Sequence, residues 1–333
     1  MSTPTKRKKR RGRVRYDRIA IAFAILAVLI AVVIWLLSAI VSGIAGLFSD
    51  GADKNSSTSS ATTSSKNDTL SPTFSTTEYT QVFRSYNDIH NGFLIVVNNE
   101  NEYIFPKDET LMTPLSEAKT EHYKVKDDSI MLNTNVIKAF NSMMGGFYAL
   151  HTNNNIMVVS AYHTAEYQNI LYNQALDNNI IIPKGGFSDH HTGYAADLNS
   201  APQGEIPTSY TADGVYSWIN ENCDKYGFTL RYPDDKADIT GNKGESSHFR
   251  YVGIPHAYYM KTHNLCLEEY ISEIKNYAFG TNSLKISCYS KNYEVYYIKA
   301  KTEGNTEVFV PNNNNYTLSG NNIDGFIVTC EVK

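Results

Sequence analysis

Two stretches of the chain concentrate side chains that bind metal ions and transfer protons. The sequence SDHHTGYAAD holds two adjacent histidines, His190 and His191, and an aspartate, Asp197. Further along, the sequence ESSHFRYVG holds Glu245 and His248. A catalytic zinc ion usually takes three protein ligands from His, Asp, Glu or Cys and keeps a fourth position for water. The two stretches together therefore predict a zinc site, and the spacing leaves open which of the adjacent histidines is the ligand.

The spacing within each stretch indicates how the side chains meet. His190 and Asp197 are seven residues apart, which does not fit one face of a helix and suits a loop and a strand that return to the same point. Glu245 lies three residues before His248. If His248 binds the metal, Glu245 lies near the open coordination position, where a general base takes a proton from the attacking water. Taken singly, each side chain is an ordinary surface charge or a buried histidine, so the prediction depends on their combination.

The elements that must position these side chains are short and of both kinds. This mixture indicates an α+β fold, with a small antiparallel sheet and flanking helices that carry the zinc cleft. Apolar, β-branched runs predict strands, and apolar residues at helical spacing predict helices. The predicted strands are residues 93–97, 156–159, 228–232 and 249–252, and the predicted helices are residues 133–151, 165–175 and 213–226. Residues 256–277 predict one helix or two, broken near Asn264. Residues 78–280 form the predicted domain around the site, and the short alternating segments of residues 281–333 predict a small β-rich C-terminal extension.

The N-terminus is a strongly basic tail followed by a long apolar stretch. Residues 1–18 hold nine Lys or Arg and one acidic residue, which leaves 21 basic against 33 acidic side chains in the rest of the chain. Residues 19–48 are uncharged and long enough to span a bilayer as one helix, and longer than the apolar region of a cleavable signal peptide. The positive-inside rule places the tail in the cytoplasm. The sequence therefore predicts a single-pass cell-membrane protein with a transmembrane signal-anchor and an extracellular site.

Composition also separates a linker from the folded part. Residues 49–77 are dominated by Ser and Thr and cannot bury enough apolar surface to fold, so they predict a flexible tether. The acidic balance of the remaining chain excludes nucleic acid as the main partner, because that binding depends on Lys and Arg that neutralise phosphates.

Four cysteines, Cys223, Cys266, Cys288 and Cys330, lie far apart in the chain and form no CxxC pair. They therefore do not predict a zinc cluster or a thioredoxin-type motif. In an exported domain an even number of cysteines permits disulfides without requiring them. A Cys288–Cys330 disulfide and four buried free thiols remain equally open.

The motifs SxHxxGxAxD, ITG and ExxHFRYVG, in this order, resemble those of the VanY-like D-alanyl-D-alanine carboxypeptidases of the M15 (M15B) metallopeptidase family. The resemblance covers about residues 85–277. It implies that one zinc ion is held by His190, Asp197 and His248, with Glu245 as the general base. It thereby favours His190 over its neighbour as the ligand, and it identifies residues 78–280 as a VanY-like zinc peptidase domain.

The resemblance also implies a reaction and a substrate. It indicates a membrane-anchored zinc D,D-carboxypeptidase that removes the C-terminal D-alanine from peptidoglycan stem peptides, with Ser188 and Gln168 in contact with the substrate. The alternatives are an L,D-carboxypeptidase or a peptidoglycan endopeptidase with the same zinc site, or a non-catalytic cell-wall-binding protein. Two positions depart from the family pattern: His163 stands where an arginine usually meets the substrate, and Ser247 stands where a tryptophan is common. The change at His163 motivates the non-catalytic alternative.

Overall fold

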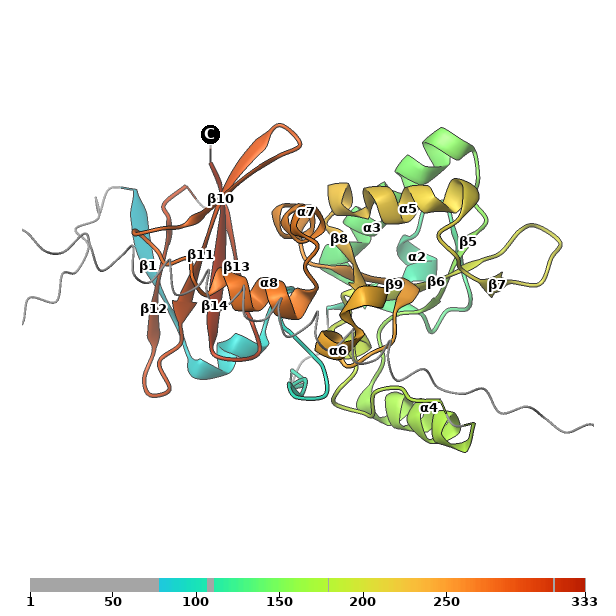
Figure 1. Ribbon diagram of the computed structural model, residues 1–333, viewed down its shortest axis with the longest axis horizontal. Coiled ribbons are helices and arrows are strands. Elements are labelled where there is room, and N and C mark those ends of the chain that lie inside the picture. Colours follow the sequence, from blue (N-terminus) through green and yellow to red (C-terminus); the bar gives the residue numbers. More distant parts are fainter. Residues whose placement is uncertain (1–77, 107–110, 179, 314, 333) are drawn as a thin grey trace, which may run out of the picture. The chain divides into compact units, whose positions relative to one another are not determined.

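The computed structural model describes residues 78–106, 111–178, 180–313 and 315–332 (Figure 1). The predicted basic tail, transmembrane signal-anchor and linker, residues 1–77, lie outside these ranges. Within the described ranges, no helix combines the length and the apolar composition that a membrane span requires.

The described chain alternates short strands with helices, as the sequence predicts. The strands are β1 (Tyr79–Arg84), β2 (Met112–Pro114), β3 (Lys124–Val125), β4 (Met131–Asn133), β5 (Ile156–Ser160), β6 (Ala195–Ser200), β7 (Thr208–Ser209), β8 (Phe228–Tyr232), β9 (Glu245–Tyr251), β10 (Leu284–Cys288), β11 (Lys291–Lys299), β12 (Thr306–Pro311), β13 (Tyr316–Gly320) and β14 (Gly325–Val332). The α-helices are α2 (Leu115–Ala118), α3 (Thr134–His151), α4 (Ala165–Asp177), α5 (Ser217–Asn222), α6 (Ala237–Thr240), α7 (Ile254–His263) and α8 (Leu267–Ile274). Single 3-10 turns are η1 (Tyr86–His90), η2 (Asp189–Thr192), η3 (Gly214–Tyr216), η4 (Cys223–Tyr226) and η5 (Asp234–Lys236).

One sheet carries the two stretches that the sequence singles out. Its strand order is β3-β5-β6-β9-β8, with the short β7 paired to β6. Only the β3–β5 pair is parallel, and the other pairs are antiparallel. In the register of β6 and β9, Asp197 lies directly opposite His248. Because directly opposite residues point to the same face of a sheet, this register alone brings two predicted ligands together.

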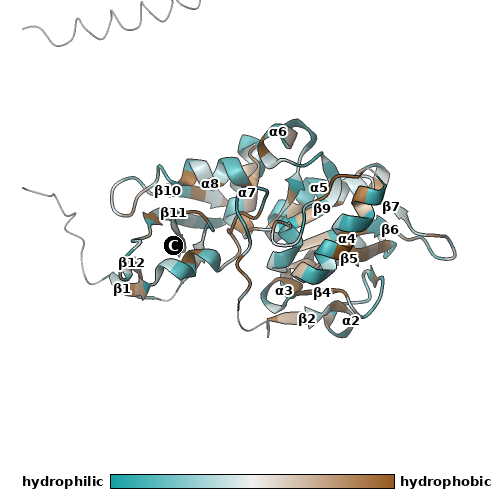
Figure 2. Ribbon diagram, turned by 90° about the horizontal axis from the view of Figure 1, so that it is seen from below, coloured by the Kyte–Doolittle hydropathy of each residue, from teal (hydrophilic) through white to brown (hydrophobic). Residues whose placement is uncertain are grey.

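Helix α3 forms much of the apolar core beneath this sheet. Its buried residues recur at helical spacing and pack with apolar residues of β5, β6, β8 and β9. The helix starts where the Asn133 side chain accepts a hydrogen bond from the Asn135 backbone amide, which satisfies one of the unpaired groups of the first turn. Figure 1 shows α3 and α5 on the same side of the sheet, and Figure 2 shows hydrophilic and hydrophobic residues side by side on the helices, as amphipathic helices require.

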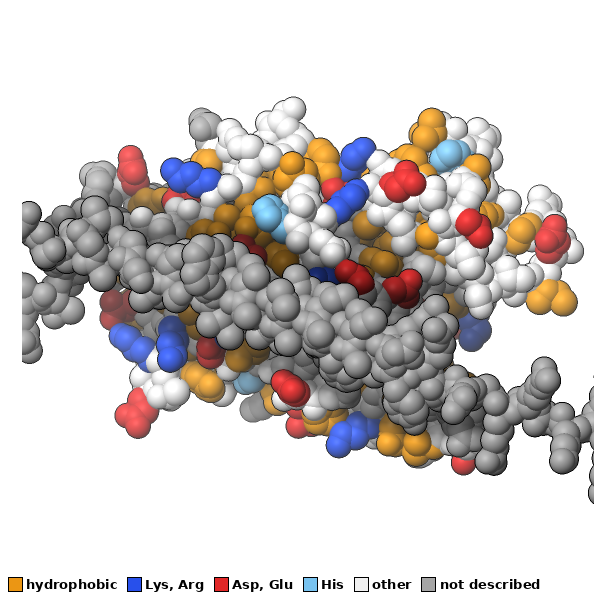
Figure 3. Space-filling model, viewed as in Figure 1, with side chains coloured by type: hydrophobic (Ala, Val, Ile, Leu, Met, Phe, Trp, Pro, Cys, Tyr) orange, Lys and Arg blue, Asp and Glu red, His pale blue; other side chains and the backbone are white. Residues whose placement is uncertain are grey.

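A second sheet, with the order β10-β11-β14-β13, is formed by the C-terminal segment, which confirms its β-rich character. Its β10 and β11 strands share a core with the apolar face of α8, to which Leu267, Tyr270 and Ile274 contribute. At the start of the described chain, β1 pairs with β12. Segments on both sides of the predicted boundary at residue 280 therefore pack together, and the boundary stays a prediction. On the face shown in Figure 3, acidic and basic side chains are interspersed.

Residues 93–97 are the clearest local correction, because they do not form the predicted strand. The apolar side chains of residues 94–97 are buried as expected, but side chains take several of the backbone hydrogen bonds that a neighbouring strand would supply. Arg250 Nη2 donates to the carbonyl oxygens of Phe93 and Ile95 at 3.1 and 2.9 Å. Asn322 Nδ2 donates to the Val96 oxygen at 2.8 Å. An apolar run predicts burial, and the tertiary partners decided how its backbone groups are satisfied.

All four cysteines are buried free thiols. Cys288 lies on β10 and Cys330 on β14, and β11 lies between these strands in the sheet. The Cys288–Cys330 pairing is therefore wrong, since bridged cysteines must lie within a few ångströms of each other.

Candidate metal centre

Three predicted ligands meet at one point above the sheet. The ligand atoms of His190, Asp197 and His248 all lie within 4.8 Å of one another. His190 Nε2 lies 3.1 Å from Asp197 Oδ2, and His248 Nδ1 lies 2.8 Å from Asp197 Oδ1. Turn η2 delivers His190, and Gly193 then takes a left-handed conformation, with φ +69°, that turns the chain into β6. The loop-and-strand return predicted from the seven-residue spacing is confirmed.

The His190 ring is oriented by the backbone. Its Nδ1 donates a hydrogen bond to the Ala161 carbonyl oxygen at 2.6 Å, which fixes the tautomer and leaves Nε2 directed at Asp197. The neighbouring His191 is completely buried and points elsewhere. Its Nδ1 donates to the His163 oxygen at 2.7 Å, and its Nε2 accepts from the Gly186 amide at 2.9 Å. With both ring nitrogens engaged in this way, His191 holds a loop in place, and His190 is the one of these two neighbours that joins the cluster.

Asp197 shows the feature that fits a cation. Its Oδ1 is buried and makes no well-formed hydrogen bond within the described residues, although a ring nitrogen of His248 lies 2.8 Å away. A buried carboxylate oxygen of this kind is costly unless a positive charge compensates it. Two histidine nitrogens and one carboxylate are a donor set that zinc takes at catalytic sites. The residues present therefore fit a zinc ion.

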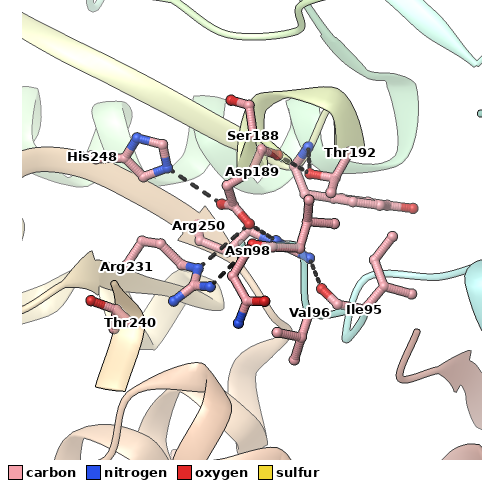
Figure 4. A network of polar contacts seen from close by, with 12 residues as sticks. Ile95, Val96, Asn98, Ser188, Asp189, Thr192, Arg231, Thr240, His248 and Arg250 are labelled. Atoms are coloured by element: carbon pink, nitrogen blue, oxygen red, sulfur yellow. Dashed lines mark hydrogen bonds and ion pairs between the residues drawn. The ribbon is translucent and has the colours of Figure 1, made fainter. Parts of the chain in front are cut away.

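A fourth side chain, Asp189, fixes the His248 ring from the other side and was not singled out from the sequence. His248 Nε2 donates to Asp189 Oδ2 at 3.3 Å, so Nδ1 is the nitrogen left to face Asp197 (Figure 4). Burial opposes protonation of His248, but the two flanking carboxylates outweigh it and raise its pKa to about 10. The only sequence signal for Asp189 was its position next to His190.

Two buried arginines neutralise Asp189. Arg250 Nη1 donates to its carboxylate, and Arg231 Nε lies 3.5 Å from the same oxygen. Arg231 also donates twice to Glu268, at 2.6 and 2.9 Å. The pKa of Asp189 stays well below its usual range because the arginines and His248 outweigh the effect of burial. Figure 4 shows both arginines at Asp189, and with Glu268 two positive and two negative side chains balance one another behind the metal cluster.

The cluster opens into a cleft of about 580 Å³. Glu245 and Ser188 both line this cleft. Glu245 is exposed at the first position of β9, and Ser247 Oγ donates to its carboxylate at 3.3 Å. Ser188 is buried, and its hydroxyl accepts from the His190 amide at 3.4 Å. The predicted base and the predicted substrate contact are therefore brought together with the metal cluster.

His163 and Gln168 form part of the cleft wall. His163 Nδ1 donates to Gln168 Oε1 at 2.8 Å, and its Nε2 accepts from Ser160 Oγ at 2.8 Å. Gln168 Nε2 in turn donates to the Pro183 oxygen at 2.7 Å. Burial and the neighbouring His190, whose ring centroid lies 4.4 Å away, lower the pKa of His163 to about 3. His163 is therefore a neutral part of the wall.

Comparisons with known proteins agree with this geometry. Residues 129–254 match the family model described as VanY, D-alanyl-D-alanine carboxypeptidase. A D-alanyl-D-alanine carboxypeptidase of Enterococcus faecium is 34% identical over 219 residues, which cover 62% of this chain and 64% of that protein. The bifunctional D-Ala-D-Ala dipeptidase and D-Ala-D-Ala carboxypeptidase VanXYC of Enterococcus gallinarum is 33% identical over 126 residues, which cover 34% of this chain and 65% of that protein. This chain thus spans less than two thirds of the length of these curated relatives.

A solved structure extends the similarity to three dimensions. The vancomycin resistance D,D-dipeptidase VanXYg, crystallised with a D-Ala-D-Ala phosphinate analogue, superposes with a TM-score of 0.68 at 30% sequence identity. The match covers 76% of this chain and 99% of that one. The similarity therefore includes most of the described residues.

Proposed function

Because this chain belongs to the VanY-like D-alanyl-D-alanine carboxypeptidase family of M15 metallopeptidases, we propose that it is a zinc carboxypeptidase of the cell wall. Its substrate is a peptidoglycan stem peptide, from which it removes the C-terminal D-alanine. The observation that carries the proposal is the His190–Asp197–His248 cluster in one cleft with Glu245.

The four residues divide two roles in this proposal, metal ligand and general base. His190, Asp197 and His248 hold the zinc ion, which supplies a Lewis acid for the scissile carbonyl and lowers the pKa of the attacking water. Glu245 accepts the proton of that water and returns it to the leaving amine of D-alanine. Its exposure in the cleft supports this role, because a base that exchanges protons with substrate must reach it.

The remaining parts of the cleft position the peptide. The Ser188 hydroxyl lies beside His190, where it can donate to the substrate, and His163 and Gln168 form a wall whose own hydrogen bonds keep it rigid. A rigid wall holds the scissile bond in a fixed relation to Glu245, which is the condition for efficient transfer of a proton.

We further propose that the enzyme is a single-pass protein of the cell membrane. Residues 19–48 form the transmembrane signal-anchor, residues 1–18 lie in the cytoplasm, and the linker of residues 49–77 carries the peptidase to the cell wall outside. The support for this arrangement is the long uncharged apolar stretch with its basic flank.

The test is metal content and product analysis on the full chain in detergent, for the wild type beside Glu245→Ala. The wild type is expected to bind one zinc ion and to release D-alanine from a peptide ending in D-Ala-D-Ala. Glu245→Ala is expected to bind the same amount of zinc and to lose activity by at least about a hundredfold.

The alternative specificities give different products in the same experiment. Release of D-alanine only from tetrapeptides would identify an L,D-carboxypeptidase, and shortened cross-bridges in digested muropeptides would identify an endopeptidase. Binding of stem peptides without turnover by zinc-loaded wild type would reject the enzyme and favour a cell-wall-binding protein, the alternative that His163 motivates.

A further inference from the structure

A carboxypeptidase must recognise the free carboxylate at the end of its substrate, and the described residues of this cleft offer one lysine or arginine for that task. A carboxylate that leaves water needs a cation or several hydrogen-bond donors. Among the described residues that line the cleft, Lys243 is the only lysine or arginine. The other charged lining residues, apart from histidines, are Asp197 and Glu245.

The net charge of the zinc-loaded cleft favours the binding of an anion when Lys243 is included. A zinc ion carries two positive charges, which Asp197 and Glu245 cancel when both are ionised. Lys243 then leaves one positive charge, which a single substrate carboxylate neutralises. Without Lys243 the same carboxylate would enter a cleft with no charge to compensate it, which opposes its transfer from water.

The other basic side chains near the centre are already engaged. Arg231 and Arg250 are fully buried and bind the carboxylates of Asp189 and Glu268. His163 has both ring nitrogens in hydrogen bonds within the protein, to Ser160 and Gln168. None of these three side chains has a free donor directed at the substrate.

Lys243, in contrast, is available. Its side chain is exposed, and it makes no ion pair within the described chain. Five other lysines do pair with carboxylates: Lys236, Lys261, Lys275, Lys291 and Lys301.

The backbone that carries Lys243 is tightly held. It lies in the short loop between α6 and β9, two residues before Glu245. The next residue, Gly244, packs so closely on Asp234 that an added Cβ would collide with it. The loop therefore presents Lys243 at a defined place on the cleft rim.

We propose that Lys243 binds the C-terminal carboxylate of the substrate. The inference rests on the proposed carboxypeptidase function and assigns its requirement for a free C-terminus to one side chain. Lys243 is then the residue that distinguishes a terminal peptide bond from an internal one.

The test compares Lys243→Gln with the wild type on two substrates, a peptide ending in D-Ala-D-Ala and the same peptide with a C-terminal amide. For the acid peptide, we expect Lys243→Gln to raise KM about tenfold or more and to change kcat little, because a charge-assisted contact to the ground state is lost. For the amide, which lacks the carboxylate, we expect the two proteins to have the same KM. Lys243→Arg should restore most of the preference for the acid.

Two controls keep the result interpretable. Lys291→Gln removes the same charge from β11, outside the cleft, and should leave both KM values unchanged. Zinc content and circular dichroism of Lys243→Gln should match those of the wild type. The inference is overturned if Lys243→Gln leaves the acid KM unchanged, or weakens the acid and the amide equally. A wild type that releases D-alanine from neither peptide would instead reject the proposed function itself.

Discussion

His248 and His256 lie only eight residues apart and are both buried, yet their surroundings favour opposite charge states. His248 lies between the carboxylates of Asp197 and Asp189, which raise its pKa to about 10 against the effect of burial. His256 lies on α7 and contacts Tyr270 Oη at 2.5 Å and Thr329 Oγ1 at 2.9 Å. No carboxylate of the described residues opposes burial here, and burial lowers the pKa of His256 to about 3.

The difference shows that burial alone does not decide what a histidine does. At His248 two carboxylates stabilise a buried positive charge, and two arginines in turn neutralise one of them, Asp189. A site that attracts a proton this strongly also attracts a metal ion. Metal binding at His248 must then displace that proton. At His256 the same ring joins α7, α8 and β14 through neutral hydrogen bonds. The surroundings of His248 stabilise a charge, and those of His256 disfavour one.

The largest expected contrast comes from the same substitution at both histidines. His248→Asn should abolish activity and weaken zinc binding by more than about a hundredfold, because one of three ligands is lost. His256→Asn should keep wild-type zinc affinity and lower only the stability of the fold. Competition with a chelator measures the affinity, and equal affinities for the two variants would contradict the assignment of His248.

The second contrast concerns the charges behind His248. Asp189→Asn should lower the free energy of unfolding by about 3–5 kcal/mol, because Arg250 loses its buried partner, and should weaken zinc binding by about 10- to 100-fold. Glu268→Gln is the matched control, since it breaks a buried pair with Arg231 without touching His248. It should destabilise the fold and leave the zinc affinity nearly unchanged. A similar loss of zinc affinity in both variants would show that Asp189 stabilises the fold and does not act on the metal site through His248.

The third contrast is the pH dependence of stability at His256. Its folded-state pKa of about 3 lies below the value of 6.5 for a histidine in water, so between these values the unfolded chain binds more protons. The contribution of neutral His256 is complete above pH 6.5 and is lost progressively as the pH falls toward 3, with a slope of at most about 1.4 kcal/mol per pH unit.

Denaturant unfolding of the wild type and His256→Gln across this range isolates the effect, because glutamine keeps a polar side chain and does not titrate. The difference in unfolding free energy between the two proteins should shrink as the pH falls. A constant difference would show that His256 is not buried as a neutral ring.

The smallest expected effect tests the neutral hydrogen bonds of the second region. Thr329→Val removes the hydroxyl that meets His256 Nε2 and nearly preserves the volume of the side chain. It should lower the free energy of unfolding by about 1 kcal/mol and leave zinc affinity and activity unchanged. A change in zinc affinity would show that the two regions are coupled.

The metal cluster was predicted from sequence because its ligands lie in short motifs whose spacing constrains them. The four charged residues behind it were not predicted, because each is an ordinary charged residue in its own segment. Arg231 and Glu268, for example, are 37 residues apart, and nothing local to either indicates that they meet. The strand predicted at residues 93–97 is absent for a related reason. An apolar run indicates burial, whereas the arginine that binds the carbonyl oxygens of this run lies on β9.

The sequence by itself determined the residue types of the site, the elements that carry them and the family to which they belong. Helical and strand periodicities and the ligand motifs are properties of neighbouring residues, so they are present before the chain folds. Only the tertiary structure decided that Asp189 and Asp197 flank His248 and favour a positive charge there, that burial keeps His256 neutral, and that Lys243 lines the cleft without an ion pair in the described chain. These properties depend on what faces each side chain across the fold, and the electrostatic free energy of a buried group is set by those neighbours.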